Sequence, residues 1–409
     1  MNSNIGMKLK SCPTWVKIAF IDIVSFILAY FLINYLDILT HDYKWIQVIK
    51  QNGLFHVYDS FEGVIPVDLP PLYIFWLYVI KDLVGNEFSN FTQLIMKLLP
   101  LVVQIIAQIF IYKKISPEAA LKWSVNAAIL VNIVYYGQRD GIVGLLIILF
   151  FYFMYKEKWL LPALSVACLA LFKPQGFYFV FILLLYYFVK KVPFKKVLIA
   201  FLLSVSIGYL VFLPFAIASG EMLISIKLYL FDFSFRKVFG SIAGNIWGLF
   251  EYWPIPGWLS KISLLLILLC MVIAIFVYRK TSDFIYTSVV YMFLVYMITF
   301  SQQGRYSIYT MFIMFAGIFI YGREEYKNTY VFLMLSALLG QVGMLAYNKT
   351  IVDYFGLEVI NTSVTMSYSM RSMLWTLRYI FIILTFLINI YCFWEIISMK
   401  RSSEISAEK

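Results

Sequence analysis

The sequence predicts an all-α membrane protein, a polytopic bundle of about 12 transmembrane helices. Three observations carry this prediction. The 409 residues are 62% hydrophobic, with a mean hydropathy of +0.84. Only 13% of them are charged, against about 25% in soluble domains. Apolar stretches long enough for helices recur along nearly the whole chain, so a water-soluble fold is excluded.

The first apolar stretch, 15–36, follows Lys8 and Lys10 and has the length of about 20 residues that a spanning helix needs. It lacks a small-residue cleavage site, so we expect a retained anchor and not a signal peptide. Further apolar ranges follow at short intervals. The predicted spans are 15–36, 92–112, 120–136, 141–155, 159–171, 175–189, 197–218, 262–278, 284–300, 306–321, 329–347 and 373–398.

The net charge of +11 comes largely from basic clusters in the short loops between these ranges. This pattern reports membrane topology through the positive-inside tendency, and no nucleic-acid partner is expected. Exactly two spans separate consecutive clusters, so all of them fall on the cytoplasmic side, and both termini are predicted to be cytoplasmic. The clusters are Lys113/Lys114, Lys156/Lys158, Lys190/Lys191/Lys195/Lys196, Arg279/Lys280, Arg323/Lys327 and Lys400/Arg401.

One apolar run, 72–83, does not fit as a span. At 1.5 Å per residue it covers about 18 Å, less than the hydrocarbon core of about 30 Å. We therefore expect an interfacial helix inside a long first external loop, 37–91. Residues 1–398 form one transmembrane domain, and 399–409 form a polar cytoplasmic tail. The other long external loops are predicted at 219–261 and 348–372.

Acidic residues in the first external loop are candidates for proton transfer. Asp42 lies just beyond the first predicted helix, where a carboxylate could take a proton from an acceptor hydroxyl as a general base. The alternative reading is that the acids of this loop are ordinary solvated charges.

Two turns join unusually short apolar ranges. They contain Gln138 with Asp140, and Lys173. Helices this short reach less than the membrane thickness, so both turns should lie below the outer surface, where charged backbone turns are tolerated only in protein or in a wet cavity. Ionisable residues at that depth are functional candidates. The alternative is that the helices are tilted, or the bilayer thinned, around purely structural turns.

A further external turn carries Arg305 and Tyr306. Together with the two deep turns and Asp42 it predicts a cavity that opens outward and holds both carboxylates and cations. Such a set suits displacement of a phosphate leaving group, because a base activates the acceptor while fixed cations stabilise the developing negative charge.

Several short motifs in this order resemble the GT-C superfamily of polyprenyl-phosphate-dependent glycosyltransferases, and most closely the bacterial relatives of the GPI-anchor mannosyltransferases. The resemblance covers about residues 15–321. The motifs are Asp42, Asp68-Leu69-Pro70-Pro71-Leu72-Tyr73, Gly137-Gln138-Arg139-Asp140, Lys173-Pro174-Gln175, Asn245 with Trp247, and Arg305-Tyr306. Where those mannosyltransferases carry His-Glu before the Arg-Tyr pair, this chain has Gln303-Gly304.

The resemblance implies an inverting transfer of mannose or another hexose from a polyprenyl-phosphate-linked donor, outside the cytoplasm. Asp42 matches the catalytic carboxylate, Asp140 would be a second one, and Lys173 and Arg305 would meet the donor phosphate. The other substrate-binding candidates are Tyr306, Gln138, Asp68, Asn245 and Trp247.

The implied partners are the lipid-linked donor, a glycan or lipid-linked acceptor, and membrane lipids, in the plasma membrane of a bacterium. Two other functions stay open: a flippase or transporter of lipid-linked saccharides, and a polysaccharide polymerase. A divalent cation also stays open as a cofactor. Its candidate ligands are His41 and His56, the only histidines, but their spacing fixes no metal geometry.

Overall fold

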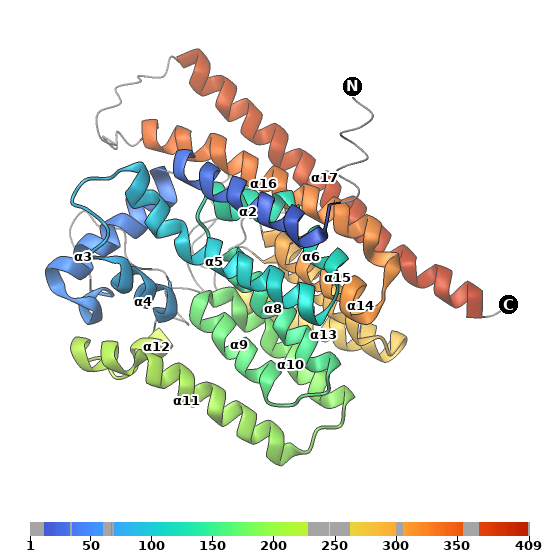
Figure 1. The fold of residues 1–409 in the computed structure, drawn as a ribbon. Helices are drawn as coiled ribbons and strands as arrows, with labels where there is room; N and C mark the ends of the chain where they lie inside the picture. The colour runs from blue at the N-terminus through green and yellow to red at the C-terminus, as the bar shows by residue number, and fades with distance from the viewer. Residues whose placement is uncertain are drawn as a thin grey trace.

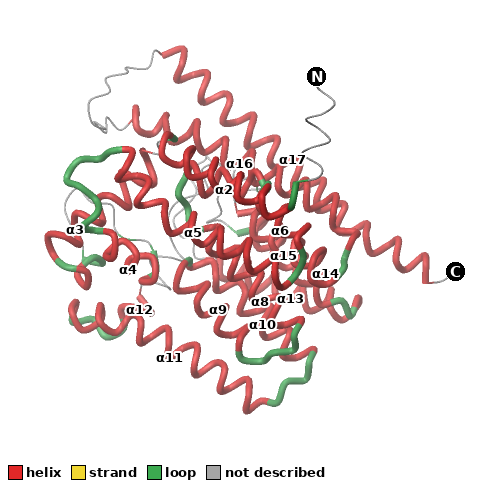
Figure 2. The backbone as a smooth tube through the Cα atoms, in the orientation of Figure 1, coloured by secondary structure: helices red, strands yellow, loops and turns green. Residues whose placement is uncertain are grey.

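The computed structural model describes residues 12–32, 35–59, 67, 69–227, 245, 262–299, 306–354 and 368–407. Helices make up the architecture, and no strand occurs in these residues (Figures 1 and 2). The first half contains α2 (Thr14–Phe31), the π-helix η1 (Tyr35–Tyr43), α3 (Lys44–Asn52), η2 (Leu54–His56), α4 (Pro71–Ile80), α5 (Asn90–Lys114), α6 (Pro117–Ser124), α7 (Ala127–Leu130), the π-helix η3 (Val131–Tyr135), α8 (Asp140–Tyr155), α9 (Leu161–Phe172), η4 (Pro174–Phe177) and α10 (Tyr178–Val189). The second half contains α11 (Phe194–Ser219), α12 (Ile224–Lys227), α13 (Ile262–Thr281), α14 (Phe284–Ile298), α15 (Ser307–Tyr321), η9 (Glu324–Tyr326), α16 (Lys327–Tyr354) and α17 (Tyr368–Ala407).

Local sequence signals explain several helix starts. The Ser89 hydroxyl accepts a hydrogen bond from the Thr92 N–H at the start of α5, and Ser116 does the same for Ala119 at the start of α6. Asn126 caps α7 through the Ile129 N–H. Each cap satisfies one of the N–H groups that a helix leaves without an internal partner.

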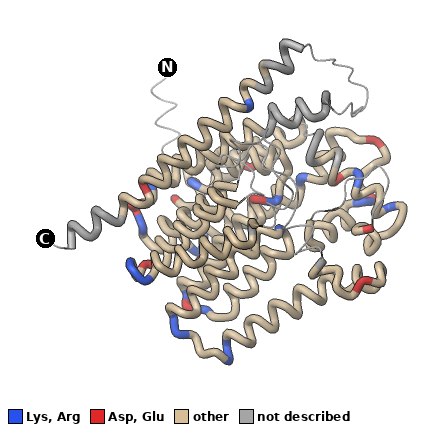
Figure 3. Tube along the Cα trace, turned by 180° about the vertical axis from the view of Figure 1, so that it is seen from behind, with Lys and Arg blue, Asp and Glu red and all other residues tan. Residues whose placement is uncertain are grey.

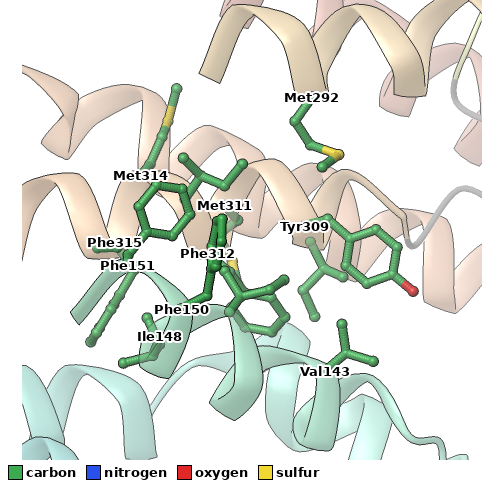
Figure 4. Packing of buried hydrophobic residues seen from close by; sticks show 14 of the residues in the cluster. Val143, Ile148, Phe150, Phe151, Met292, Tyr309, Met311, Phe312, Met314 and Phe315 are labelled. Carbon is green, nitrogen blue, oxygen red and sulfur yellow. The ribbon is translucent and has the colours of Figure 1, made fainter. Parts of the chain in front are cut away.

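The centre of the bundle is α8, which packs against α5, α9 and α15. Figure 4 shows Phe150 and Phe151 of α8 packed among Met311, Phe312 and Phe315 of α15, all of them fully buried. The close approach depends on α8 having glycine at 144, because a Cβ there would lie within 3 Å of the Phe312 and Trp123 rings. The apolar side chains of α8 thus form the centre of the core, and their packing holds the helix in place.

Five helices are long and apolar enough to cross a membrane, among the residues described: α2, α5, α11, 264–281 within α13, and 376–399 within α17. The prediction of an all-helical membrane protein is confirmed to this extent. A helix also lies in each of the other predicted ranges. Of these helices, α8, α9, α10, α14 and α15 are shorter than 18 residues, and the range 120–136 is divided into α6, α7 and η3. The run at 72–83 forms the ten-residue helix α4.

Two features of the C-terminal part differ from the expected boundaries. Helix α16 continues to Tyr354 and α17 begins at Tyr368, so both helices extend into the range 348–372 assigned to a loop. Helix α17 also continues through most of the polar tail, to Ala407, and packs along α16 (Figure 1).

The two ends of the bundle differ in charge. Figure 3 shows many of the Lys and Arg residues gathered around the end where the C terminus lies, with some Asp and Glu residues among them, while the opposite end, with α3 and α4, carries fewer charges of both signs. Charged side chains are also buried inside the bundle, among them Asp42, Arg139, Asp140 and Lys173. Buried charges are costly unless they are paired, so these side chains are candidates for a functional site.

Candidate functional site

Asp42 lies near the end of the π-helix η1 and is only 3% exposed. Its Oδ1 accepts a hydrogen bond from Arg139 Nη2 at 2.7 Å, and its Oδ2 accepts one from the Tyr73 hydroxyl at 2.7 Å. The Arg139 guanidinium also lies 3.8 Å from the centre of the Tyr73 ring. Segments far apart in the chain therefore meet at one carboxylate.

Tyr73 holds its proton firmly in this arrangement. It belongs to α4, outside the candidate spanning helices. Complete burial raises its pKa well above the ordinary value, and the negative charge of Asp42 raises the pKa further. The hydroxyl therefore stays protonated at neutral pH and remains a donor to Asp42.

A second carboxylate, Asp140, is the first residue of α8 and is completely buried. It forms an ion pair with Lys173, which lies between α9 and η4. The Tyr309 hydroxyl donates to Asp140 Oδ1 at 2.8 Å, and Asn132 Nδ2 donates to Oδ2 at 2.8 Å. The two deep turns thus meet. Both carboxylates are buried and each is paired with a cation, as buried charges require; the outward-opening cavity stays a prediction, because Arg305 lies outside the described residues.

Aromatic rings surround the Lys173 ammonium. Its Nζ lies 5.1 Å from the centre of the Tyr306 ring and 5.8 Å from that of Tyr309. The two rings are stacked with their centres 5.4 Å apart, and Gln175 Nε2 donates to the Tyr306 hydroxyl at 3.3 Å. The cation is attracted by both ring faces, so its position is set by α15 as well as by Asp140.

Two consecutive residues connect the two carboxylates, since Arg139 binds Asp42 and Asp140 binds Lys173. The preceding Gly137 has φ of +61°, the left-handed region that favours glycine. Gln138, beside it, is buried and its Oε1 lies 3.4 Å from Arg139 Nη1. The turn 137–140 thus places both ion pairs within one small region.

Both acidic segments are joined to π-helical turns. Asp42 lies inside η1, and η3 ends two residues before Gly137. π-helical turns are rare in proteins overall, and those that occur are often found at functional sites. Their occurrence next to both carboxylates marks this region as the candidate site.

Lys97 of α5 holds these segments in place. Its Nζ donates to the carbonyl oxygens of Ala29 at 3.2 Å and Leu32 at 2.7 Å, at the end of α2, and to that of Val134 in η3 at 2.8 Å. The side chain is fully buried. The ammonium therefore joins the segment leading to Asp42 to the segment leading to Asp140.

Replacement Lys97→Met should impair function more than stability. Gln93 Nε2 also donates to the Ala29 and Leu32 carbonyls, so these two oxygens keep a donor in the variant. The Val134 carbonyl loses its hydrogen bond from Lys97, at a cost of about 1–3 kcal/mol in stability. In a catalytic site, a displacement of about 1 Å can reduce turnover by about 10²-fold. Thermal unfolding and turnover measured on the same sample test this, with Lys81→Met as the control. Equal losses in both variants would contradict a positioning role.

Gly176 permits the close turn that carries Lys173. A Cβ at this position would lie 2.7 Å from Ala170 Cα and still closer to the Ala170 nitrogen. Backbone atoms cannot yield as a flexible side chain can, so Gly176→Ala should destabilise the protein by about 1–3 kcal/mol. Gly208→Ala is the control, because nothing lies within 4 Å of its added Cβ. Unfolding curves of both variants check this, and equal midpoints would contradict the tight packing.

The remaining predicted residues are spread more widely. Asn245 is buried, and its Nδ2 donates to the carbonyls of Tyr296 and Thr299 at 3.1 Å, so it is bound to the end of α14. Three predicted residues lie outside the described part of the chain. They are Asp68, Trp247 and Arg305.

The two histidines differ in their surroundings, since His41 directly precedes Asp42 in η1 and His56 lies in η2. His56 Nδ1 lies 3.0 Å from Asp59 Oδ2 at the surface, and the His41 ring meets the Trp45 ring edge-on at 5.5 Å. In the described ranges no group of three His, Cys, Asp or Glu side chains is placed to hold a metal ion. The structure therefore supplies no metal geometry at either histidine.

Tyr309 and Asn132 were not predicted to lie at the site, and Arg139 was predicted only as a position within a motif. Tyr309 follows Tyr306 by one helical turn, and Asn132 is an amide within an apolar range; both were detectable as polar groups on the core face. Comparison with known proteins adds no assignment, because no protein-family model, no curated protein and no solved structure matches the chain.

Proposed function

We propose that the chain is a membrane glycosyltransferase of the GT-C type, with about 12 spanning helices and both termini cytoplasmic. It would transfer mannose or another hexose from a polyprenyl-phosphate-linked donor to a glycan or lipid-linked acceptor outside the cytoplasm. The observation that carries the proposal is the joined pair of buried clusters, Asp42 with Arg139 and Asp140 with Lys173. Asp140 lies at the first residue of α8, at the opposite end of that helix from the basic loop that begins at Lys156.

Each group has a defined part in the proposed reaction. Asp42 takes the proton of the acceptor hydroxyl as that oxygen attacks C1 of the sugar from the face opposite the phosphate. The C1–O bond to the phosphate breaks, and the polyprenyl phosphate leaves with the electron pair. Lys173 and Arg305 stabilise the negative charge on the leaving phosphate, and the single displacement inverts the anomeric configuration.

The ion pairs support this proposal in the absence of substrate. A buried carboxylate next to a cation stays ionised, which a general base requires. Lys173 is likewise already paired with a carboxylate, Asp140, which the donor phosphate could replace as its partner. Fixed charges of this kind stabilise a transition state without reorganising at the moment of reaction.

A donor panel tests the enzyme class. Purified protein in proteoliposomes is offered labelled polyprenyl-phosphate mannose, glucose and galactose, and in parallel the nucleotide-linked sugars, with membranes of a strain lacking the protein as acceptor source. Transfer from a lipid-phosphate sugar alone would support the proposal. Transfer only from a nucleotide sugar, or no transfer from any donor, would contradict it.

A further inference from the structure

A second site lies at the basic end of the bundle, in a pocket of about 600 Å³. It is formed where α8, α10, α13 and α15 end and α14 begins, and it is called the loop pocket below. Helix α8 connects the two sites, since Asp140 is its first residue and Tyr155, in the pocket wall, is its last. Helix α8 is sixteen residues long, which corresponds to about 24 Å. The loop pocket is therefore distinct from the carboxylate site.

The charges that line the loop pocket are balanced. Among the lining residues, Lys190 and Glu157 form one ion pair at 2.6 Å, and Arg323 and Asp283 form a second. Arg323 Nε also lies 3.0 Å from Oε1 of Glu325, beside the pocket. The hydrogen bond from Lys190 holds the pKa of Glu157 below its ordinary value, so Glu157 is ionised at neutral pH. A simple anion or cation would meet a like charge on each pair, whereas a zwitterion finds an opposite charge for each of its ends.

Two residues that line the loop pocket, Glu157 and Ser282, and one residue next to its lining, Lys191, adopt a backbone conformation that side chains disfavour. Glu157, Lys191 and Ser282 have φ of 54°, 49° and 53°, and they are the only non-glycine residues with positive φ in the described ranges. They follow the ends of α8, α10 and α13, where glycine is the usual residue. Each costs about 1–2 kcal/mol relative to the right-handed form. The left-handed turns at Glu157 and Ser282 place these two side chains in the pocket wall.

The pocket wall favours an ammonium group next to a phosphate. Four helix C-termini, which carry partial negative charge, and one N-terminus meet there. The Tyr155 and Tyr321 rings, 5.4 Å apart, also line it, and aromatic faces attract ammonium groups. Lys190 and Arg323 are the residue types that bind phosphate. The helix C-termini and the tyrosine rings thus suit the ammonium group of a zwitterion, and Lys190 and Arg323 suit its phosphate.

We propose that the loop pocket binds the headgroup of a zwitterionic phospholipid, phosphatidylethanolamine, from the leaflet at the basic end. Its ammonium group lies toward Glu157 and Asp283, and its phosphate lies toward Lys190 and Arg323. The neighbouring surface suits the acyl chains, because Phe188 and Leu184 of α10 are 74% and 52% exposed.

The test is a lipid titration followed by native mass spectrometry. Wild-type protein in detergent is titrated with phosphatidylethanolamine, and separately with phosphatidylglycerol and phosphatidylcholine of the same acyl chains. We expect one phosphatidylethanolamine to be retained at least about tenfold more tightly than either other lipid, since one charged hydrogen-bonding group is worth about that factor. The proposal would be overturned if phosphatidylglycerol or phosphatidylcholine were retained as tightly as phosphatidylethanolamine.

Variants at the exposed ion pair locate the binding. Glu157→Gln and Lys190→Gln should each weaken phosphatidylethanolamine retention by about tenfold, with unchanged unfolding temperature because both side chains are largely exposed. Asp82→Asn, in the exposed pair with Lys81, is the matched control and should leave retention unchanged. Full retention in both pocket variants, or the same loss in the control, would show that the lipid binds elsewhere.

Discussion

Asp42→Asn is expected to abolish sugar transfer, reducing the rate by about 10²- to 10⁴-fold, because an amide cannot accept the acceptor proton. The substituted side chain has nearly the same shape, and its oxygen can still accept a hydrogen bond from Arg139 or Tyr73, the present partners of Asp42. The loss should therefore exceed any loss of folded protein. Transfer is measured at matched amounts of folded protein, which are determined by thermal unfolding.

The Asp42→Asn variant leaves the buried Arg139 guanidinium without its counter-charge, so a control variant is needed for the resulting loss of stability. Arg139 is 7% exposed, and a buried charge without its counter-charge can destabilise a protein by several kcal/mol. In the double variant Asp42→Asn with Arg139→Gln both charges are removed, so stability should recover while transfer stays absent. Transfer that returns in the double variant would contradict the role of Asp42 as base.

Loss of either partner of the second ion pair is expected to have the largest effect on stability. Lys173→Met removes the cation that pairs with the buried Asp140, which keeps the neutral donors Asn132 and Tyr309, and Asp140→Asn removes the carboxylate that pairs with Lys173. Each change should cost about 3–5 kcal/mol. The double variant should cost less than the sum, because it removes both charges.

A double-mutant cycle of Asp140 and Lys173, measured by thermal or denaturant unfolding, gives the coupling energy. Residues in direct contact couple by about 0.5–3 kcal/mol. The same cycle on the exposed pair Lys81 and Asp82 is the control, and its coupling should be at most about 1 kcal/mol. Additive costs at Asp140 and Lys173 would contradict the buried ion pair.

The sequence predicted the membrane class and the carboxylates more readily than their environment. Asp140 and Lys173 were identified because ionisable groups beside short apolar helices are functional candidates, and the structure brings them together. Arg139 carries the same signal, but one sequence does not reveal which of two adjacent charges faces which partner. Lys97 lies inside an apolar range, where the same rule would have identified it.

Two features of the fold could not be predicted from apolar length. The range 120–136 reads as one helix, yet it is broken at Val125 and Asn126 and continues as the π-helix η3. Segment η1, which contains Asp42, is also π-helical. π-helical turns have no distinctive composition, because they depend on tertiary packing and not on local preference. The pairing of Asp42 with Arg139 follows from these turns.

The most direct test of the proposed function follows both halves of the donor at once. Polyprenyl-phosphate mannose, or whichever lipid-phosphate hexose the donor panel selects, is labelled in the sugar with one isotope and in the lipid with another. Wild type and Asp42→Asn are then compared in proteoliposomes with acceptor. The proposal predicts that wild type moves the sugar label to the acceptor while the lipid label remains as polyprenyl phosphate, and that Asp42→Asn does neither. Two labels that stay together and only change leaflet would contradict a transferase and establish a transporter.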